Sequence, residues 1–227
     1  MSDRALVAPR AIIFDWDNTL IDSWACIHAA VNATLRAMGR SEWTSAEAKT
    51  RAARSLRDSF PTLFGDRWTE ARDIFYAAFA ATHLEHLRPM PGAAGMLEYL
   101  NARGLALSVV SNKAGEYLRQ EVDHLGWAKF FDRIVGATDT VHDKPATAPV
   151  HLALGTRRLV PGADIWFVGD APVDMECALR SGCTPILIRQ DPPGDREFDD
   201  YPPRHHVPGC DEFVSLVNEL LVPISMN

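Results

Sequence analysis

The order of hydrophobic and polar positions predicts an alternation of strands and helices over most of the chain. Short apolar runs rich in Ile, Val, Leu and Phe predict buried strands at 11–14, 105–110, 131–135, 165–168 and 184–188. Apolar residues spaced three and four apart predict amphipathic helices at 93–103, 114–125, 173–181 and 211–221. Pro145 stands where a further helix can begin. This alternation predicts an α/β fold with a doubly wound parallel sheet that helices cover on both faces.

Residues 22–88 follow a different pattern, because helical periodicity continues there without a strand signal. Thr44 and Glu47 have the spacing of a capping box, and Pro61 is expected to interrupt the helical pattern that follows. The predicted helices lie at about 23–38, 44–60 and 69–87. We therefore expect two domains, an α/β core of residues 1–21 and 89–227 and a small helical domain of residues 22–88 inserted into it.

Polar side chains follow three of the five predicted strands. The first strand ends in Asp15 and Asp17, and two acids this close need a cation or a shared proton. Open parallel sheets bind ligands outside the carboxyl ends of their strands, so we expect the polar side chains at these ends to converge. The set consists of Asp15, Asp17, Ser111, Asn112, Asp170 and Asp174, with Lys144 at a predicted helix start.

Composition and charge exclude several classes of protein. The 227 residues are 47% hydrophobic and 23% charged, which is ordinary for a globular domain. The net charge of −7 argues against a nucleic-acid partner, because such proteins present a basic face. No apolar run is long enough to predict a membrane span. The polar N-terminus and four cysteines without metal-ligand spacing predict a cytoplasmic protein with free thiols. The sequence leaves both a monomer and a homodimer open.

Four short motifs resemble those of the haloacid dehalogenase superfamily, in particular its phosphoglycolate-phosphatase-like members with a helical cap after the first strand. The motifs are Asp15-Trp16-Asp17-Asn18-Thr19, Ser111-Asn112, Lys144-Pro145 and Gly169-Asp170 through Asp174. The resemblance covers about residues 11 to 221, and it implies a Rossmann-like core with residues 22–88 as a mobile cap. At the position of Trp16 it implies a role mainly for the backbone.

The resemblance also implies an activity, a Mg²⁺-dependent phosphatase that hydrolyses a small phosphate monoester through an aspartyl phosphate. Asp15 would attack phosphorus, and Asp17 would protonate the leaving alcohol and later activate water. Ser111, Asn112 and Lys144 would bind the phosphoryl group, and Lys144 would keep Asp15 ionised. The implied metal ligands are Asp15, Asp17 through its backbone carbonyl, Asp170 and Asp174.

The substrate stays open, beyond a small phosphorylated metabolite as the expected partner. His28, Arg51 and Arg54 are candidates for contact with it, while a histidine packed on an apolar face and a solvated basic helix are the alternative interpretations. A phosphomutase is an alternative on the same scaffold. A phosphonate hydrolase is another, and its imine-forming lysine would be Lys49, the only lysine of residues 22–88. A non-catalytic binding module is the third alternative.

Overall fold

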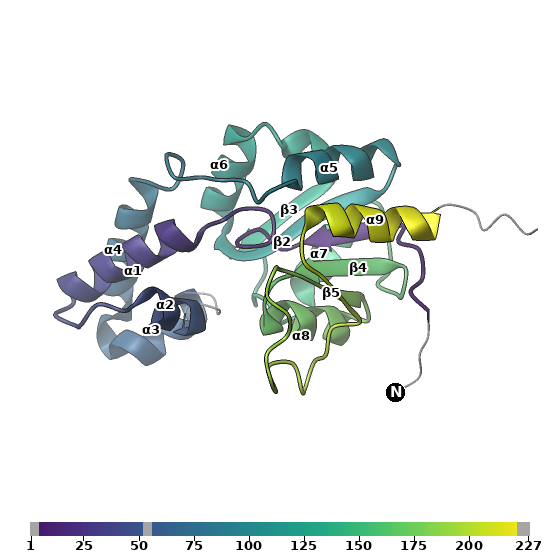
Figure 1. The fold of residues 1–227 in the computed structure, drawn as a ribbon. Coiled ribbons are helices and arrows are strands. Elements are labelled where there is room, and N and C mark those ends of the chain that lie inside the picture. Colours follow the sequence, from purple (N-terminus) through teal and green to yellow (C-terminus); the bar gives the residue numbers. More distant parts are fainter. Residues whose placement is uncertain (1–4, 52–55, 222–227) are drawn as a thin grey trace, which may run out of the picture.

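A six-stranded parallel sheet forms the centre of the fold (Figure 1). The computed structural model describes residues 5–51 and 56–221, without the side chains of residues 49–51, 57 and 58. In the order β3-β2-β1-β4-β5-β6, the strands are β3 Arg133–Ala137, β2 Ala106–Ala114, β1 Ala11–Phe14, β4 Ile165–Gly169, β5 Thr184–Ile188 and β6 His205–Val207. The predicted α/β class is confirmed. The winding reverses between β1 and β4, where sheets of this kind bind ligands.

Helices cover both faces of the sheet, because successive residues of a strand point to opposite faces. Ile12 and Phe14 of β1 belong to one apolar cluster, and Ile13 belongs to a second cluster on the other face. The first cluster includes side chains of α5 Ala93–Ala102, α6 Gly115–His124 and α9 Cys210–Leu221, and the second includes those of α7 Ala148–Gly155 and α8 Pro172–Ser181. Every residue of β1 is buried, which explains its unbroken apolar sequence.

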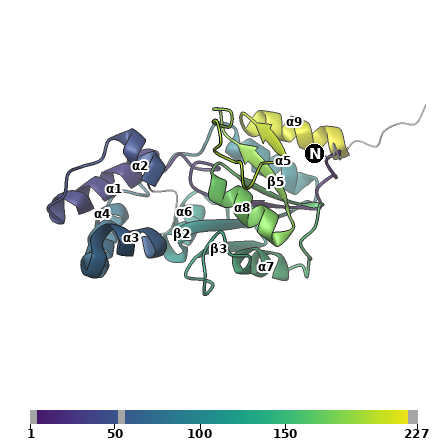
Figure 2. The ribbon, with the colours of Figure 1, turned by 90° about the horizontal axis from the view of Figure 1, so that it is seen from below.

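Residues 22–88, called the helical insertion below, form a group of helices beside the sheet (Figure 2). Its helices are α1 Trp24–Ala37, α2 Ser45–Arg51, α3 Leu56–Phe64 and α4 Trp68–Ala80. They share an apolar cluster that includes Phe60 and Phe75. The two connections to the core run side by side, since the Asp22 N–H donates to the Arg88 carbonyl at 2.8 Å. No helix in the described part of the chain is long and apolar enough to cross a bilayer.

Within the insertion, the capping box is confirmed and the effect expected of Pro61 is wrong. The Thr44 N–H donates to Glu47 Oε2 at 2.9 Å, and the Glu47 N–H donates to Thr44 Oγ1 at 3.3 Å. Pro61 lies inside α3 instead of ending a helix. The buried rings of Phe60 and Phe64 on either side of it lie 5.0 Å apart, and their packing compensates for the backbone hydrogen bond that a proline removes.

The last insertion helix and two parts of the core also differ from prediction. Helix α4 ends at Ala80 instead of 87, after which the chain turns and His83 reaches Glu121 of α6. Helix α7 begins at Ala148 instead of Pro145, because residues 143–146 form a turn closed by a backbone hydrogen bond of 2.9 Å. Strand β6 was not predicted, since its three residues include two histidines and give no apolar signal.

Candidate active site

Asp15 and Asp17 stand on a tight turn directly after β1. The Ile21 N–H donates to the Trp16 carbonyl at 3.1 Å. Asn18 has a left-handed φ of 61°, a conformation that Asn adopts more readily than most residues. Because the chain turns here, the two carboxylates are not alternate side chains of one straight strand, and they can approach one point from two sides.

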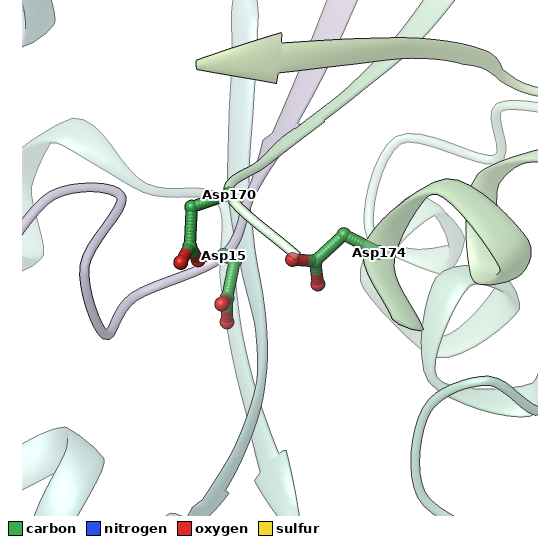
Figure 3. A group of neighbouring side chains, drawn as sticks. All are labelled: Asp15, Asp170 and Asp174. Carbon is green, nitrogen blue, oxygen red and sulfur yellow. The ribbon is translucent and has the colours of Figure 1, made fainter. Parts of the chain in front are cut away.

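Two further carboxylates come from the end of β4 and the first turn of α8. Oxygen atoms of Asp15, Asp170 and Asp174 all lie within 4.8 Å of one another, and Figure 3 shows the three side chains converging. Gly169 permits this approach, since a Cβ there would lie 2.4 Å from Cβ of Asp174. A residue larger than glycine would therefore displace α8 from the strand end.

Lys144 lies between two of these acids. Its Nζ is 2.7 Å from Asp15 Oδ1 and 2.7 Å from Asp174 Oδ1, and its side chain is 2% exposed. Asp174 Oδ2 accepts the Ala171 N–H at 3.1 Å, so both oxygens of Asp174 are engaged. Asp15 Oδ1 contacts the Lys144 ammonium, and this is the only partner of that oxygen among the described residues. Asp15 thus keeps the capacity to bind a ligand.

The charges of this cluster are unbalanced, because three carboxylates face one ammonium group. Burial raises the pKa of Asp15 from 3.8 to about 7, while Lys144 opposes this shift and Asp174 adds to it. Burial, followed by the charges of Asp174 and Asp15, also holds the pKa of Asp170 well above its usual value. Lys144 favours the ionised form of Asp15, as expected, but burial outweighs its effect on the pKa. A hard dication would balance the surplus, and oxygen ligands are the ones that Mg²⁺ prefers.

Ser111 and Asn112 line the same cleft as Asp15, and they lie within β2 rather than after it. Ser111 Oγ accepts the Lys113 N–H at 3.2 Å, and Asn112 Nδ2 donates to the Lys144 carbonyl at 3.2 Å. Asn112 Oδ1 is buried without a hydrogen-bond partner in the described ranges. The Ser111 hydroxyl and the second N–H of the Asn112 amide are the groups here that could donate to an anion, whereas Asn112 Oδ1 can only accept.

The cleft above these residues has a volume of about 1210 Å³ and separates the sheet edge from the helical insertion. Its floor is polar and includes the side chains described above. Its opposite wall is largely aromatic and aliphatic, with Trp24, Ile27, Trp43, Leu63 and Tyr76 from the insertion and Tyr117 from α6. The Tyr76 and Tyr117 rings stack with centroids 5.3 Å apart. A ligand with a charged end and an apolar body matches this division.

A second buried charge cluster, which was not predicted from the sequence, lies beside Asp17. Lys113 Nζ lies 2.7 Å from Asp17 Oδ1 and 2.6 Å from Glu121 Oε2. Burial lowers the pKa of Lys113, but the charges of Asp17 and Glu121 more than offset this, so that its pKa is raised. Trp16 Nε1 donates to Glu121 Oε2 at 2.7 Å, and the indole is fully buried. The Trp16 side chain therefore has a structural role in addition to the backbone role expected for this position.

A signal for Glu121 was present in the sequence. Leu118, Val122 and Leu125 have helical spacing, which places Glu121 on the apolar face of its helix. An acid on an apolar face needs buried partners, but spacing along the chain does not identify them. The partners are distant segments, since His83 Nδ1 of the insertion lies 2.9 Å from Glu121 Oε1.

Three residues of the insertion were predicted to contact substrate. One of them lies outside the described lining of the cleft, and the side chains of the other two are not among the described residues. His28 Nε2 lies 2.8 Å from the Trp43 carbonyl and 3.0 Å from Asn32 Nδ2, and it is absent from the described lining of the cleft. Its contacts link α1 to the loop before α2. The side chain of Arg51 and all of Arg54 lie outside the described residues.

Comparisons with known proteins agree with this geometry. A phosphoglycolate phosphatase from Aquifex aeolicus (strain VF5) is 30% identical over 179 residues, which cover 78% of this chain and 84% of that protein. The crystal structure of a HAD-superfamily hydrolase from Ehrlichia chaffeensis is similar at 28% identity and a TM-score of 0.66, over 96% of this chain and 100% of that chain. A haloacid dehalogenase-like family hydrolase from Streptococcus pneumoniae is similar at 25% identity and a TM-score of 0.81, over 92% and 98%.

The family model described as haloacid dehalogenase-like hydrolase matches residues 12–188. That range begins in β1 and ends with β5. It therefore contains the helical insertion and every acid, amide, hydroxyl and ammonium group of the polar cluster. On this match and on the similarity to the Aquifex protein, the chain belongs to the haloacid dehalogenase-like hydrolases.

Proposed function

We propose that the protein is a Mg²⁺-dependent phosphatase that hydrolyses a small phosphate monoester through an aspartyl phosphate on Asp15. The observation that carries the proposal is the position of Asp15. Its carboxylate ends the central strand, borders the cleft, lies 2.7 Å from Lys144 Nζ and clusters with Asp170 and Asp174. The phosphoglycolate phosphatases among the relatives support phosphate esters as the substrate class.

Asp15, Asp170 and Asp174 would hold the metal ion, together with the backbone carbonyl of Asp17. Their excess of negative charge and the raised pKa of Asp15 are the reasons to expect a dication there. When bound, Mg²⁺ supplies the positive charge that reduces repulsion between an anionic nucleophile and a phosphate dianion.

The first step uses the chain's own groups as follows. An Asp15 oxygen attacks phosphorus while the bond between phosphorus and the alcohol oxygen breaks. Asp17, as the acid, gives its proton to the departing oxygen. Lys144, which already contacts Asp15, attracts the negative charge that develops on the phosphoryl oxygens. The Ser111 hydroxyl and the Asn112 amide donate hydrogen bonds to the same oxygens.

The second step returns the protein to its starting state. Asp17 is now a carboxylate, and it removes a proton from a water molecule that attacks phosphorus. The bond between phosphorus and the Asp15 oxygen breaks, so that phosphate leaves and the Asp15 carboxylate is restored. Asp17 ends this step protonated, as the next turnover requires.

The experiment is a phosphate-release assay with p-nitrophenyl phosphate, with and without Mg²⁺, followed by acid-quench detection of protein-bound phosphate. We expect Mg²⁺-dependent turnover in the wild type and none in Asp15→Asn. Asp17→Asn should form the phosphoenzyme from this substrate, whose leaving group needs no proton, and then accumulate it, because water is not activated. Turnover by Asp15→Asn above a few per cent of wild type would contradict the nucleophile assignment.

The phosphate-release assay and two added reagents distinguish the alternative functions. A phosphomutase would release little phosphate and would depend on a bisphosphate primer. A phosphonate hydrolase would form an imine between Lys49 and a phosphonoaldehyde, which borohydride would trap; the side chain of Lys49 lies outside the described residues. A binding module would bind phosphate without turnover. A panel of phosphate monoesters, with phosphoglycolate among them, then ranks substrates by kcat/KM.

A further inference from the structure

Glu121 of α6 is a buried carboxylate that the proposed reaction does not use. Its side chain is 1% exposed, and three donors from three separate segments surround it. Trp16 Nε1 donates to Oε2 at 2.7 Å, Lys113 Nζ donates to Oε2 at 2.6 Å, and His83 Nδ1 lies 2.9 Å from Oε1. A buried acid with this many charge-assisted contacts is fixed in position.

Two of the three contacts lead to Asp17. Lys113 Nζ lies 2.7 Å from Asp17 Oδ1 while it contacts Glu121. Trp16 is the residue that precedes Asp17, and its indole is fully buried between Glu121 and the Trp127 ring, whose centroid is 5.8 Å away. Glu121 therefore restrains Asp17 both through its side-chain partner and through the backbone of its turn.

The two carboxylate oxygens of Asp17 have different surroundings. Oδ1 contacts the Lys113 ammonium and accepts the Ser23 hydroxyl. The Asp17 side chain is partly exposed and borders the cleft. With Oδ1 held in this way, Oδ2 is the oxygen that can face a leaving group.

We infer that Glu121 is a positioning residue for the proton transfers of Asp17, an inference that rests on the proposed phosphatase function. A lysine side chain has four rotatable carbon bonds, and an ammonium held by Asp17 alone would move with it. Glu121 gives Lys113 a second, immobile carboxylate, so that the ammonium stays in one place and Asp17 stays oriented. His83 orients Glu121 from the far side, where it stacks on Phe79 with centroids 4.9 Å apart.

A positioning role predicts an effect that depends on the leaving group. An alkoxide leaves only with a proton, whereas p-nitrophenolate leaves without one. Misplacement of Asp17 should therefore slow the attack on an alkyl phosphate much more than the attack on p-nitrophenyl phosphate. Loss of packing or of folded protein would lower both rates by the same factor. The ratio kcat/KM reports the first irreversible step, so it measures this difference directly.

The test compares benzyl phosphate with p-nitrophenyl phosphate, two substrates of similar size, in Glu121→Gln at saturating Mg²⁺. We expect kcat/KM for benzyl phosphate to fall about 10- to 100-fold, a fraction of what general acid catalysis contributes. For p-nitrophenyl phosphate we expect a loss of less than about threefold. The control is Glu116→Gln, an exposed acid in the first turn of the same helix, which should change neither value.

A double-mutant cycle tests whether Glu121 acts through Lys113. Lys113→Met keeps the aliphatic stem and should show the same selective loss. Glu121→Gln combined with Lys113→Met should lose no more than Lys113→Met alone, because residues in one network are not additive. Lys113→Met carries the substrate comparison by itself if thermal unfolding shows that Glu121→Gln does not fold.

Equal losses with both substrates, no loss with either, or additive losses in the double variant would overturn the inference. Failure of the proposed function looks different. In that case the wild type itself shows no Mg²⁺-dependent release of phosphate from either substrate.

Discussion

Replacing Asp15 by Asn should abolish turnover and at the same time stabilise the cation-free protein at neutral and alkaline pH. In the folded protein burial raises the pKa of Asp15 to about 7, from 3.8 in an unperturbed carboxyl group. Between these two values the folded state keeps a proton that the unfolded chain has lost. The contribution of Asp15 to the free energy of unfolding of the wild type therefore falls as the pH rises from about 4 to about 7, and this contribution is constant above that range.

The size of this effect follows from the two pKa values. Each pH unit between 3.8 and about 7 corresponds to about 1.4 kcal/mol, so the full penalty reaches about 4 kcal/mol above pH 7. Asn carries no ionisable proton and avoids the penalty, and it retains an oxygen that can accept from Lys144. The difference in free energy of unfolding between Asp15→Asn and the wild type should therefore decrease by about 2–3 kcal/mol from pH 8 to pH 5.

Urea unfolding at pH 8 and at pH 5 in the presence of EDTA measures this difference. Asp123→Asn is the matched control, because Asp123 is exposed on α6 and its replacement should change stability equally at both values of pH. Saturating Mg²⁺ should restore stability to the wild type at pH 8 and should do little for Asp15→Asn. A difference between wild type and Asp15→Asn that is the same at both pH values would refute the reasoning.

Three further results are expected. Gly169→Ala should destabilise the protein by about 1–3 kcal/mol in urea unfolding and weaken Mg²⁺ binding in calorimetry, because its Cβ would lie 2.4 Å from Cβ of Asp174. Affinity for Mg²⁺ should fall by at least about tenfold per pH unit below pH 7, since the ion competes with protons on Asp15 and Asp170, both of which have raised pKa values; calorimetry in buffers of different ionisation enthalpy would detect the released protons. Trp24→Ala should raise KM for benzyl phosphate and change kcat by less than about threefold, because Trp24 lines the apolar wall of the cleft and not the reacting centre.

The polar floor of the site could be predicted from sequence because of a property of parallel sheets. The carboxyl ends of β1, β2 and β4 meet at one edge, so motifs almost 100 and more than 150 residues apart converge there. Lys144 Nζ does lie 2.7 Å from a carboxylate oxygen of Asp15 and 2.7 Å from one of Asp174. The four motifs and their order were therefore enough to identify this cluster.

The second cluster could not be predicted in the same way. Glu121, Lys113 and His83 sit on a helix, a strand and a turn, and no rule of topology brings these elements together. Their contacts depend on how the helical insertion packs against α6, which spacing along the chain does not determine. The helices of the insertion were less well predicted for the same reason. Pro61 stays helical because Phe60 and Phe64 are buried, and local preference alone favours a break.

Two buried lysines divide the acids of the site between them. Lys144 contacts Asp15 and Asp174, and Lys113 contacts Asp17 and Glu121. Each ammonium contacts two carboxylates, and a fifth acid forms no ion pair with either lysine within the described residues. Asp170 is that fifth acid, and its described side-chain partner is the Thr19 hydroxyl at 3.4 Å.

The uncompensated charge is thus concentrated where Asp170 and Asp15 face the cleft. A dication bound there would be attracted by both carboxylates. The pairing of the acids with two different lysines also has a consequence for Asp17. Because Lys113 pairs with Asp17 and Glu121 and not with the metal cluster, a change of charge at that cluster need not alter the orientation of Asp17, the proposed general acid. Under the proposed function, a cation would bind at the Asp15 and Asp170 end of the site, and Asp17 would be held in place at the other end.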